Sequence, residues 1–139
     1  MRGVSLLIRL AQHDLEERRS DLGCISRALT DTETAIGTHD ETIATETSIA
    51  MTDPTAIAVF GAWASQSARG RARLQDRFEE LDQSANAARE SLRDAATQMR
   101  RLELMLDTVR AKARRLSVRQ ADARADEREL VRHAEVTPD

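Results

Sequence analysis

The side chains of this chain that could take part in catalysis or metal binding are three histidines and one cysteine. His13, His39 and His133 lie far apart in the sequence, and no histidine lies at metal-ligand spacing from Cys24. The sequence has no glycine-rich loop of the kind that holds a phosphate group. Because an enzyme needs a nucleophile, an acid, a base or a metal held in a pocket, we expect a protein without catalytic activity, bound metal or cofactor.

Basic side chains are the second group with chemical meaning, and they gather near the C-terminus. Residues 104–134 contain eight basic and five acidic residues, a net charge of +3. The basic residues are Arg110, Lys112, Arg114, Arg115, Arg119, Arg124, Arg128 and Arg132. Residues 28–68, in contrast, contain six acidic residues and no Lys or Arg. Charge separated in this way orients and captures partners of opposite potential, so we expect a binding protein.

The composition indicates long helices as the elements that position these charges. Of the 139 residues, 40% are hydrophobic and 32% charged, whereas five are Gly and two are Pro. Such a profile, poor in turn formers, is typical of long helices and predicts an all-α protein. The formal net charge of −3 argues against a general nucleic-acid binder. Only Phe60, Trp63 and Phe78 are aromatic, so the chain lacks the stacking platforms of single-strand binders.

Compartment signals are few. The single Cys24 cannot form an internal disulfide, and the short apolar run "GVSLLIRL" is interrupted by Arg9 and lacks a small-residue cleavage site. A membrane-spanning helix needs about 20 consecutive apolar residues, and no stretch of the sequence is comparable. We therefore expect a soluble cytoplasmic protein that does not insert into a membrane.

A heptad repeat runs through the second half of the chain. Apolar residues recur at alternating steps of four and three, the spacing that keeps two positions in seven facing a partner helix. The row consists of Ile57, Phe60, Ala64, Ser67, Arg71, Leu74, Phe78, Leu81, Ala85, Ala88, Leu92, Ala95, Met99, Leu102, Leu106, Val109, Ala113 and Leu116. It continues with mixed character through Gln120, Ala123, Glu127, Leu130 and Ala134. Asp53 and Pro54 fit the cap and first position of this helix, which we expect at about 54–134.

The first half has a repeat of its own at intervals of seven. Its members are Ile8, Leu15, Leu22, Leu29, Ile36, Ile43 and Ala50. We expect a helix at about 4–51, frayed or bent within the Thr-rich segment 30–55, because Thr loses side-chain freedom in a helix. A turn at about 52–54 leaves the two helices as antiparallel neighbours. The predicted fold is a single coiled-coil domain, residues 1–139, built as a helical hairpin.

The two predicted helices differ in length. At about 1.5 Å per residue, the second helix is longer than the first, so we expect residues 104–134 to overhang the N-terminus. The overhang leaves Val109, Ala113, Leu116 and Leu130 without an intramolecular partner. A frayed, solvated tail is the alternative interpretation of a charge-dense end. Near the turn, Phe60 lies on the repeat and Trp63 lies off it, which makes Trp63 either a core residue or a docking anchor.

Taken together, these features resemble one known family, the flagellar export protein FliJ with its relatives, the YscO-type stalk proteins of injectisomes. The resemblance covers nearly the whole chain. It includes the opening "LLIRLAQHDLEERRSDL" and the closing "RRLELMLDTVRAKARRLSVRQADARADERELVRHA". Within the closing stretch, Leu102-Glu103, the basic run from Arg110 to Arg115 and "ADERELV" match the family pattern. The chain departs from the family in its single Lys and its Thr-rich first helix.

The resemblance implies a non-catalytic stalk of the type III protein export apparatus. In that family the tip that carries both termini enters the hexameric export ATPase and stimulates it, and the stalk contacts the membrane export gate and export chaperones. By this resemblance, the residues expected at the ATPase are Arg110, Arg114, Arg115, Leu116, Arg119 and Arg124. Phe60 and Trp63 are those expected at the gate. An injectisome stalk and a self-associating structural coiled coil remain the alternatives.

Overall fold

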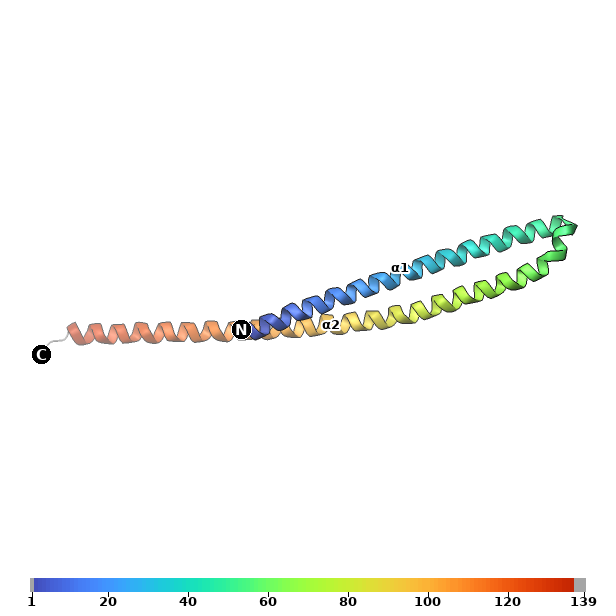
Figure 1. Ribbon diagram of the computed structural model, residues 1–139. Coiled ribbons are helices and arrows are strands. Elements are labelled where there is room, and N and C mark those ends of the chain that lie inside the picture. Colours follow the sequence, from blue (N-terminus) through green and yellow to red (C-terminus); the bar gives the residue numbers. More distant parts are fainter. Residues whose placement is uncertain (1, 137–139) are drawn as a thin grey trace. The chain divides into compact units, whose positions relative to one another are not determined.

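The computed structural model describes residues 2–136, and these residues form two long α-helices (Figure 1). Helix α1 comprises Arg2–Thr52, and helix α2 comprises Pro54–Val136. Asp53 alone separates them, and no strand occurs among the described residues. The all-α fold with two long helices in contact is confirmed. Both helices are slightly longer than the predicted ranges 4–51 and 54–134.

The described residues divide between two compact units. The first, which we call the turn unit, comprises Asp14–Ala95 and therefore includes the reversal at Asp53. The second, the terminal unit, combines residues 2–13 of α1 with residues 96–136 of α2.

The Thr-rich part of α1 is helical without interruption as far as Thr52. Its threonine hydroxyls donate hydrogen bonds to backbone carbonyls one turn earlier in the helix. The pairs, with oxygen–oxygen distances, are Thr30 with Ser26 (3.1 Å), Thr32 with Ala28 (2.8 Å), Thr42 with Thr38 (2.9 Å), Thr45 with Glu41 (3.0 Å) and Thr47 with Ile43 (2.6 Å). Each of these hydroxyls is thereby satisfied within the helix, at the cost of sharing a carbonyl that also accepts a backbone N–H, which slightly destabilises a helix.

In the turn unit, the predicted rows of α1 and α2 face each other. Every member of the α1 row from Leu15 to Ala50 is at least half-buried. On α2, Leu81, Ala85 and Ala95 are buried, and Ala85 is 0% exposed. Ala85 and Ala95 are small enough to allow the two helix backbones to approach closely, whereas Leu81 and the Leu and Ile members of the α1 row fill the contact with larger side chains.

Ile57 departs from the predicted row, since its side chain is 58% exposed. It lies in the first turn of α2, where its N–H donates to the carbonyl of Asp53 at 3.3 Å. The facing end of α1 contacts other residues of this turn, since Ile49 and Ala50 line a groove with Ala56, Val59 and Phe60, and Ile57 lies outside that contact. The covered part of the α2 row starts at Phe60, which is half-buried.

Polar side chains also join α1 to α2 within the turn unit. His39 Nε2 lies 2.7 Å from the backbone carbonyl oxygen of Ser67. Arg71 makes a two-pronged contact with Asp40, Nε to Oδ1 at 2.9 Å and Nη2 to Oδ2 at 3.4 Å. Arg18 donates a hydrogen bond to the Ser91 hydroxyl. Polar pairs at seam positions specify which turn of one helix lies beside which turn of the other.

In the terminal unit, the start of α1 covers the middle of α2. Val4, Ile8 and Ala11 are half-buried, and Leu102 of α2 is buried with 7% of its surface exposed. Leu106 and Val109 are also half-buried. From Lys112 to Val136, in contrast, every side chain is exposed. We call residues 112–136 the C-terminal segment (Figure 1).

The predicted overhang at 104–134 was therefore placed too early along α2. Leu106 and Val109 are half-covered because α1 starts at Arg2 and lies beside this part of α2, where Arg2, Ser5, Leu6 and Arg9 share a surface hollow with Arg110. Ala113, Leu116 and Leu130 are exposed, as the repeat predicted.

Replacing Ala85 by Leu is expected to destabilise the fold. The Ala85 side chain is fully enclosed, so three additional carbon atoms must push α1 and α2 apart, at a cost of about 1–3 kcal/mol. Chemical denaturation followed by circular dichroism measures the change. Ala87→Leu is the matched control, because Ala87 is exposed two residues away, and its stability should stay near that of the unchanged protein. Equal stability of both variants would contradict the packing described here.

Replacing Gly37 by Ala is expected to stabilise α1. No atom lies within 4 Å of the Cβ that this change adds, and Ala exceeds Gly in helix propensity by about 0.8–1 kcal/mol. At Gly70 the added Cβ would lie 3.4 Å from His39 Cε1, so Gly70→Ala should gain less. Thermal unfolding of the two variants tests this order, and a lower melting temperature for Gly37→Ala than for the unchanged chain would contradict it.

Candidate partner-binding surfaces

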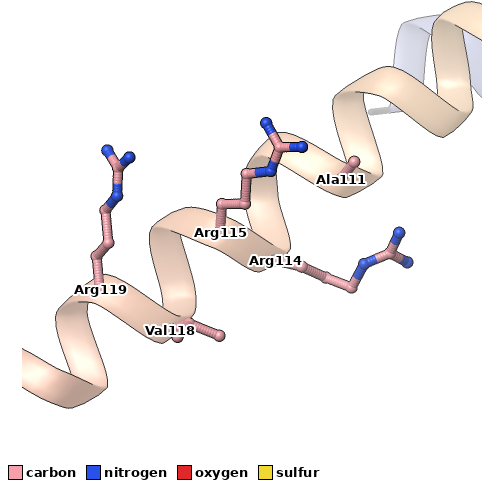
Figure 2. A pocket seen from close by; sticks show the side chains of 5 residues that line it. All are labelled: Ala111, Arg114, Arg115, Val118 and Arg119. Atoms are coloured by element: carbon pink, nitrogen blue, oxygen red, sulfur yellow. The ribbon is translucent and has the colours of Figure 1, made fainter.

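The C-terminal segment presents basic side chains on an uncovered helix. Arg114, Arg115 and Arg119 surround a shallow hollow of about 470 Å³, whose floor includes Ala111 and Val118 (Figure 2). Figure 2 shows Arg115 and Arg119 projecting from one side of α2, whereas Arg114 and Val118 project from another. Adjacent residues of an α-helix are about 100° apart around its axis, which explains the two directions. The positive charge therefore lies on more than one side of the helix.

The guanidinium groups of this segment are available to a partner. Within residues 2–136, the structure shows no ion pair for Arg114, Arg115, Arg119 or Arg124. Leu116 lies between these arginines and is 58% exposed. Guanidinium groups bind carboxylates and phosphates with two parallel hydrogen bonds. The segment thus offers charged donors together with an apolar contact.

The other two predicted ATPase-binding arginines lie at the margins of this arrangement. Arg110 lines a hollow of about 360 Å³ with Arg2, Ser5, Leu6 and Arg9 at the start of α1. Arg124 lines a separate hollow of about 320 Å³ with Glu127, Arg128 and Val131. Sequence reasoning missed Arg2 and Arg9, which the fold brings to Arg110. The antiparallel pairing of the helices was the signal that could have placed them there.

The second candidate surface lies at the reversal of the chain. Phe60 and Trp63 have ring centroids 5.8 Å apart and planes inclined by 33°. Both rings are half-buried, so Trp63 is partly packed and partly accessible. They line a groove of about 340 Å³ together with Glu46, Ile49, Ala50, Ala56 and Val59. Both residues predicted for the gate therefore contribute to one groove.

Exposed aliphatic side chains accompany the two rings, since Ile49 and Val59 line the groove and Met51 and Ile57 lie two residues from them in the sequence. Ile49, Met51, Ile57 and Val59 are between 47% and 80% exposed. With Phe60 and Trp63, they form what we call the turn surface. Because contiguous exposed apolar patches on soluble domains mark interaction sites, this surface is a candidate for binding another protein. The heptad pattern did not indicate it, since Met51 and Val59 lie off the rows and Ile57 was assigned to the covered seam.

Asp53 holds the reversal itself. Its Oδ1 accepts hydrogen bonds from the Thr55 N–H and the Thr55 hydroxyl, both at 2.9 Å, as a cap residue does at a helix N-terminus. Its own N–H donates to the Ile49 carbonyl at 3.1 Å and so closes the last turn of α1. The hydrogen bonds from the Thr55 hydroxyl and N–H lower the pKa of the Asp53 carboxyl below its ordinary value of 3.8. One residue thus ends α1 and begins α2.

Replacing Asp53 by Ala is expected to lower the melting temperature at neutral pH, because Thr55 loses its acceptor. Since the carboxyl pKa is lowered on folding, the stabilisation by Asp53 is complete above the ordinary value of 3.8 and is lost as the pH falls through the folded value. The difference between variant and unchanged protein should therefore shrink below about pH 4. Thermal unfolding between pH 2 and pH 7 measures it.

Asp53→Asn is the control for this experiment. An amide oxygen still caps the helix but does not titrate, so this variant should be less destabilised than Asp53→Ala at pH 7. A difference between Asp53→Ala and the unchanged protein that stays constant down to pH 2 would contradict the assigned role of the charge.

The residues considered for catalysis or metal binding are dispersed over the structure. His39 contacts Ser67 within the seam, and the exposed Cys24 accepts a hydrogen bond from Arg27 at 3.3 Å. Among residues 2–136, no three or more His, Cys, Asp or Glu side chains are arranged to hold a metal ion. Neither α1 nor α2, as described, contains an apolar stretch sufficient to cross a bilayer. Comparison of the chain with protein-family models, curated proteins and solved structures gave no match.

Proposed function

We propose that this chain is a non-catalytic stalk and adaptor of the flagellar type III protein export apparatus. In this proposal, its C-terminal segment enters and stimulates the hexameric export ATPase. The observation that supports the proposal best is the exposure of every side chain from Lys112 to Val136, with arginines directed to more than one side of the helix. A helix with positive charge on more than one side suits a partner that encloses it, whereas a one-sided patch suits a flat partner.

Complementary charge explains how the C-terminal segment is captured and oriented by the ATPase. An acidic or dipole-lined cavity attracts Arg114, Arg115 and Arg119, and this attraction governs orientation and capture rate more than final affinity. Leu116 supplies an apolar contact that is released from water on binding. Arg110 and Arg124 extend the basic surface on either side of this group. These six residues form the proposed ATPase-binding site.

The turn surface is the proposed binding site for the cytoplasmic part of the export gate membrane protein. Phe60 and Trp63 supply aromatic contact area, and large aromatic side chains are enriched among the residues that dominate binding energy. Export chaperones are the third class of partner in this proposal. The chain then works in the cytoplasm, associated peripherally with the export apparatus at the inner membrane.

Reversing three charges tests the ATPase-binding site. The purified chain should show no ATP hydrolysis but should raise the turnover and ring formation of its cognate export ATPase. The triple variant R114E/R115E/R119E should abolish this stimulation, because the segment then repels an acidic cavity, while circular dichroism shows unchanged helix content. Steady-state ATPase assays across a titration of each variant provide the measurement.

A second triple variant controls for the change in net charge. R73E/R77E/R89E reverses three exposed arginines of the turn unit and should retain stimulation. Full stimulation by R114E/R115E/R119E would remove the electrostatic basis of the proposal. The same assay with a flagellar and an injectisome ATPase distinguishes a flagellar stalk from an injectisome stalk. The chain should stimulate the ATPase of its own export system more strongly.

The alternative function is a scaffold that associates with copies of itself. Pairing of α1 and α2 along their whole length between molecules requires that their apolar rows are not already covered within each molecule. From Phe60 to Val109, however, the row of α2 is at least half-covered within the chain. Among the described residues, the uncovered members of the row are Ile57 and those of the C-terminal segment. Any self-association through the heptad rows should therefore be confined to that segment.

A further inference from the structure

The charges of the exposed part of α2 are segregated along the helix. Residues 108–121 contain five basic residues and no Asp or Glu. Residues 122–135 contain five acidic residues and three arginines. The acidic residues are Asp122, Asp126, Glu127, Glu129 and Glu135. The two halves therefore have opposite net charge, and each complements the other rather than itself.

The same stretch carries an uncovered apolar row. Leu116, Ala123 and Leu130 are spaced at intervals of seven, which places them on one face of α2. The side chains of Leu116 and Leu130 are 58% and 70% exposed. Within the terminal unit, the start of α1 does not extend beside this end of α2 (Figure 1). Isolated helices owe little stability to their own backbone bonds in water, so a second helix on this face would stabilise the segment.

We propose that two copies of the chain pair through their C-terminal segments as an antiparallel two-helix coiled coil. A twofold axis between Ala121 and Asp122 places residues 108–121 of one copy beside residues 122–135 of the other. Each basic stretch then faces an acid-rich stretch, twice in the dimer. In this register Leu130 lies opposite Ala113 of the second copy.

The same register places one acidic seam residue favourably. Glu127 lies opposite Leu116 of the second copy, and its carboxylate then lies between Lys112 and Arg119 of that copy. Two positive charges therefore flank Glu127, which would otherwise destabilise the dimer at this seam position.

The flanking positions of the heptad select this direction. Arg119 and Asp126 occupy the position before the seam residues Gln120 and Glu127, and Arg124 occupies the position after Ala123. In an antiparallel pair, residues that directly precede a seam residue lie beside the equivalent residues of the other copy, so Arg119 lies beside Asp126 of the second copy. In a parallel pair, Arg119 would meet Arg124 instead. Parallel pairing therefore sets like charges together, whereas antiparallel pairing joins opposite charges.

The terminal unit leaves room for this contact. Helix α1 starts at Arg2, close to Arg110, and the uncovered seam of α2 starts directly beyond it, after Ala111. The stretch that a second copy would cover is thus the stretch that α1 leaves free. The inference does not rest on the proposed function. Because both use the C-terminal segment, a dimer and an ATPase complex would exclude each other.

Sedimentation equilibrium of the full chain tests the pairing. The unchanged protein should show a concentration-dependent monomer–dimer equilibrium. Leu116→Glu should be monomeric at concentrations where the unchanged protein is dimeric, because it places a second acid opposite Glu127 in the seam. Val118→Glu is the matched control, since Val118 is also 58% exposed but lies off the seam row, and it should still dimerise. A monomer at every concentration of the unchanged protein, or equal loss in both variants, would overturn the proposal.

A charge exchange tests the direction of pairing. Arg119→Glu and Asp126→Arg should each weaken the dimer about fivefold to tenfold, the scale expected when two exposed ion pairs become repulsive. The double variant R119E/D126R should restore the affinity, because the pairs form again with exchanged signs. A stronger dimer for Arg119→Glu alone would overturn the antiparallel arrangement, since the introduced glutamate would then pair with Arg124 in a parallel dimer. Dimerisation without ATPase stimulation would contradict the proposed function alone.

Discussion

The contact between the apolar rows of α1 and α2 is the constraint on which the rest of this molecule depends. With only three aromatic residues in the chain, this contact is built mainly from Ala, Leu and Ile side chains, of which Ala85 is the most enclosed. Most side chains away from that contact are exposed. The two candidate binding surfaces lie at the two places where the apolar rows no longer cover each other.

At the turn, Ile57 and Val59 lie outside the contact between the two rows, although α1 continues to Thr52. The cap formed by Asp53 and Thr55 holds a one-residue reversal, beside which these two side chains are 58% and 68% exposed. Their exposure beside the half-buried Phe60 and Trp63 produces an apolar groove in a region without basic residues. A partner for that surface is accordingly expected to bring apolar side chains and positive charge.

At the other candidate surface, coverage is lost because α1 starts at Arg2 while α2 continues to Val136. The consequence is a segment with a seam but no partner, charged first positively and then with an acidic excess. The proposed ATPase site and the proposed antiparallel dimer are two ways to cover it. They differ in what they use, since a ring cavity contacts arginines around the helix, whereas a second copy contacts the seam row and its flanks.

The heptad spacing was sufficient to predict two helices, their approximate ends, the paired rows from Phe60 to Leu102 and the exposure of Leu116 and Leu130. It was insufficient for two members of the same row, since Ile57 was expected to be covered but is exposed, and Val109 was expected to be uncovered but is half-buried. It also gave no indication that Arg2 and Arg9 lie with Arg110, or that threonine hydroxyls bond within α1. A heptad repeat determines which face of a helix is apolar and can pack against another helix. Whether another helix is present at that level depends on where the chain reverses and where its other arm begins, and only the tertiary structure decides both.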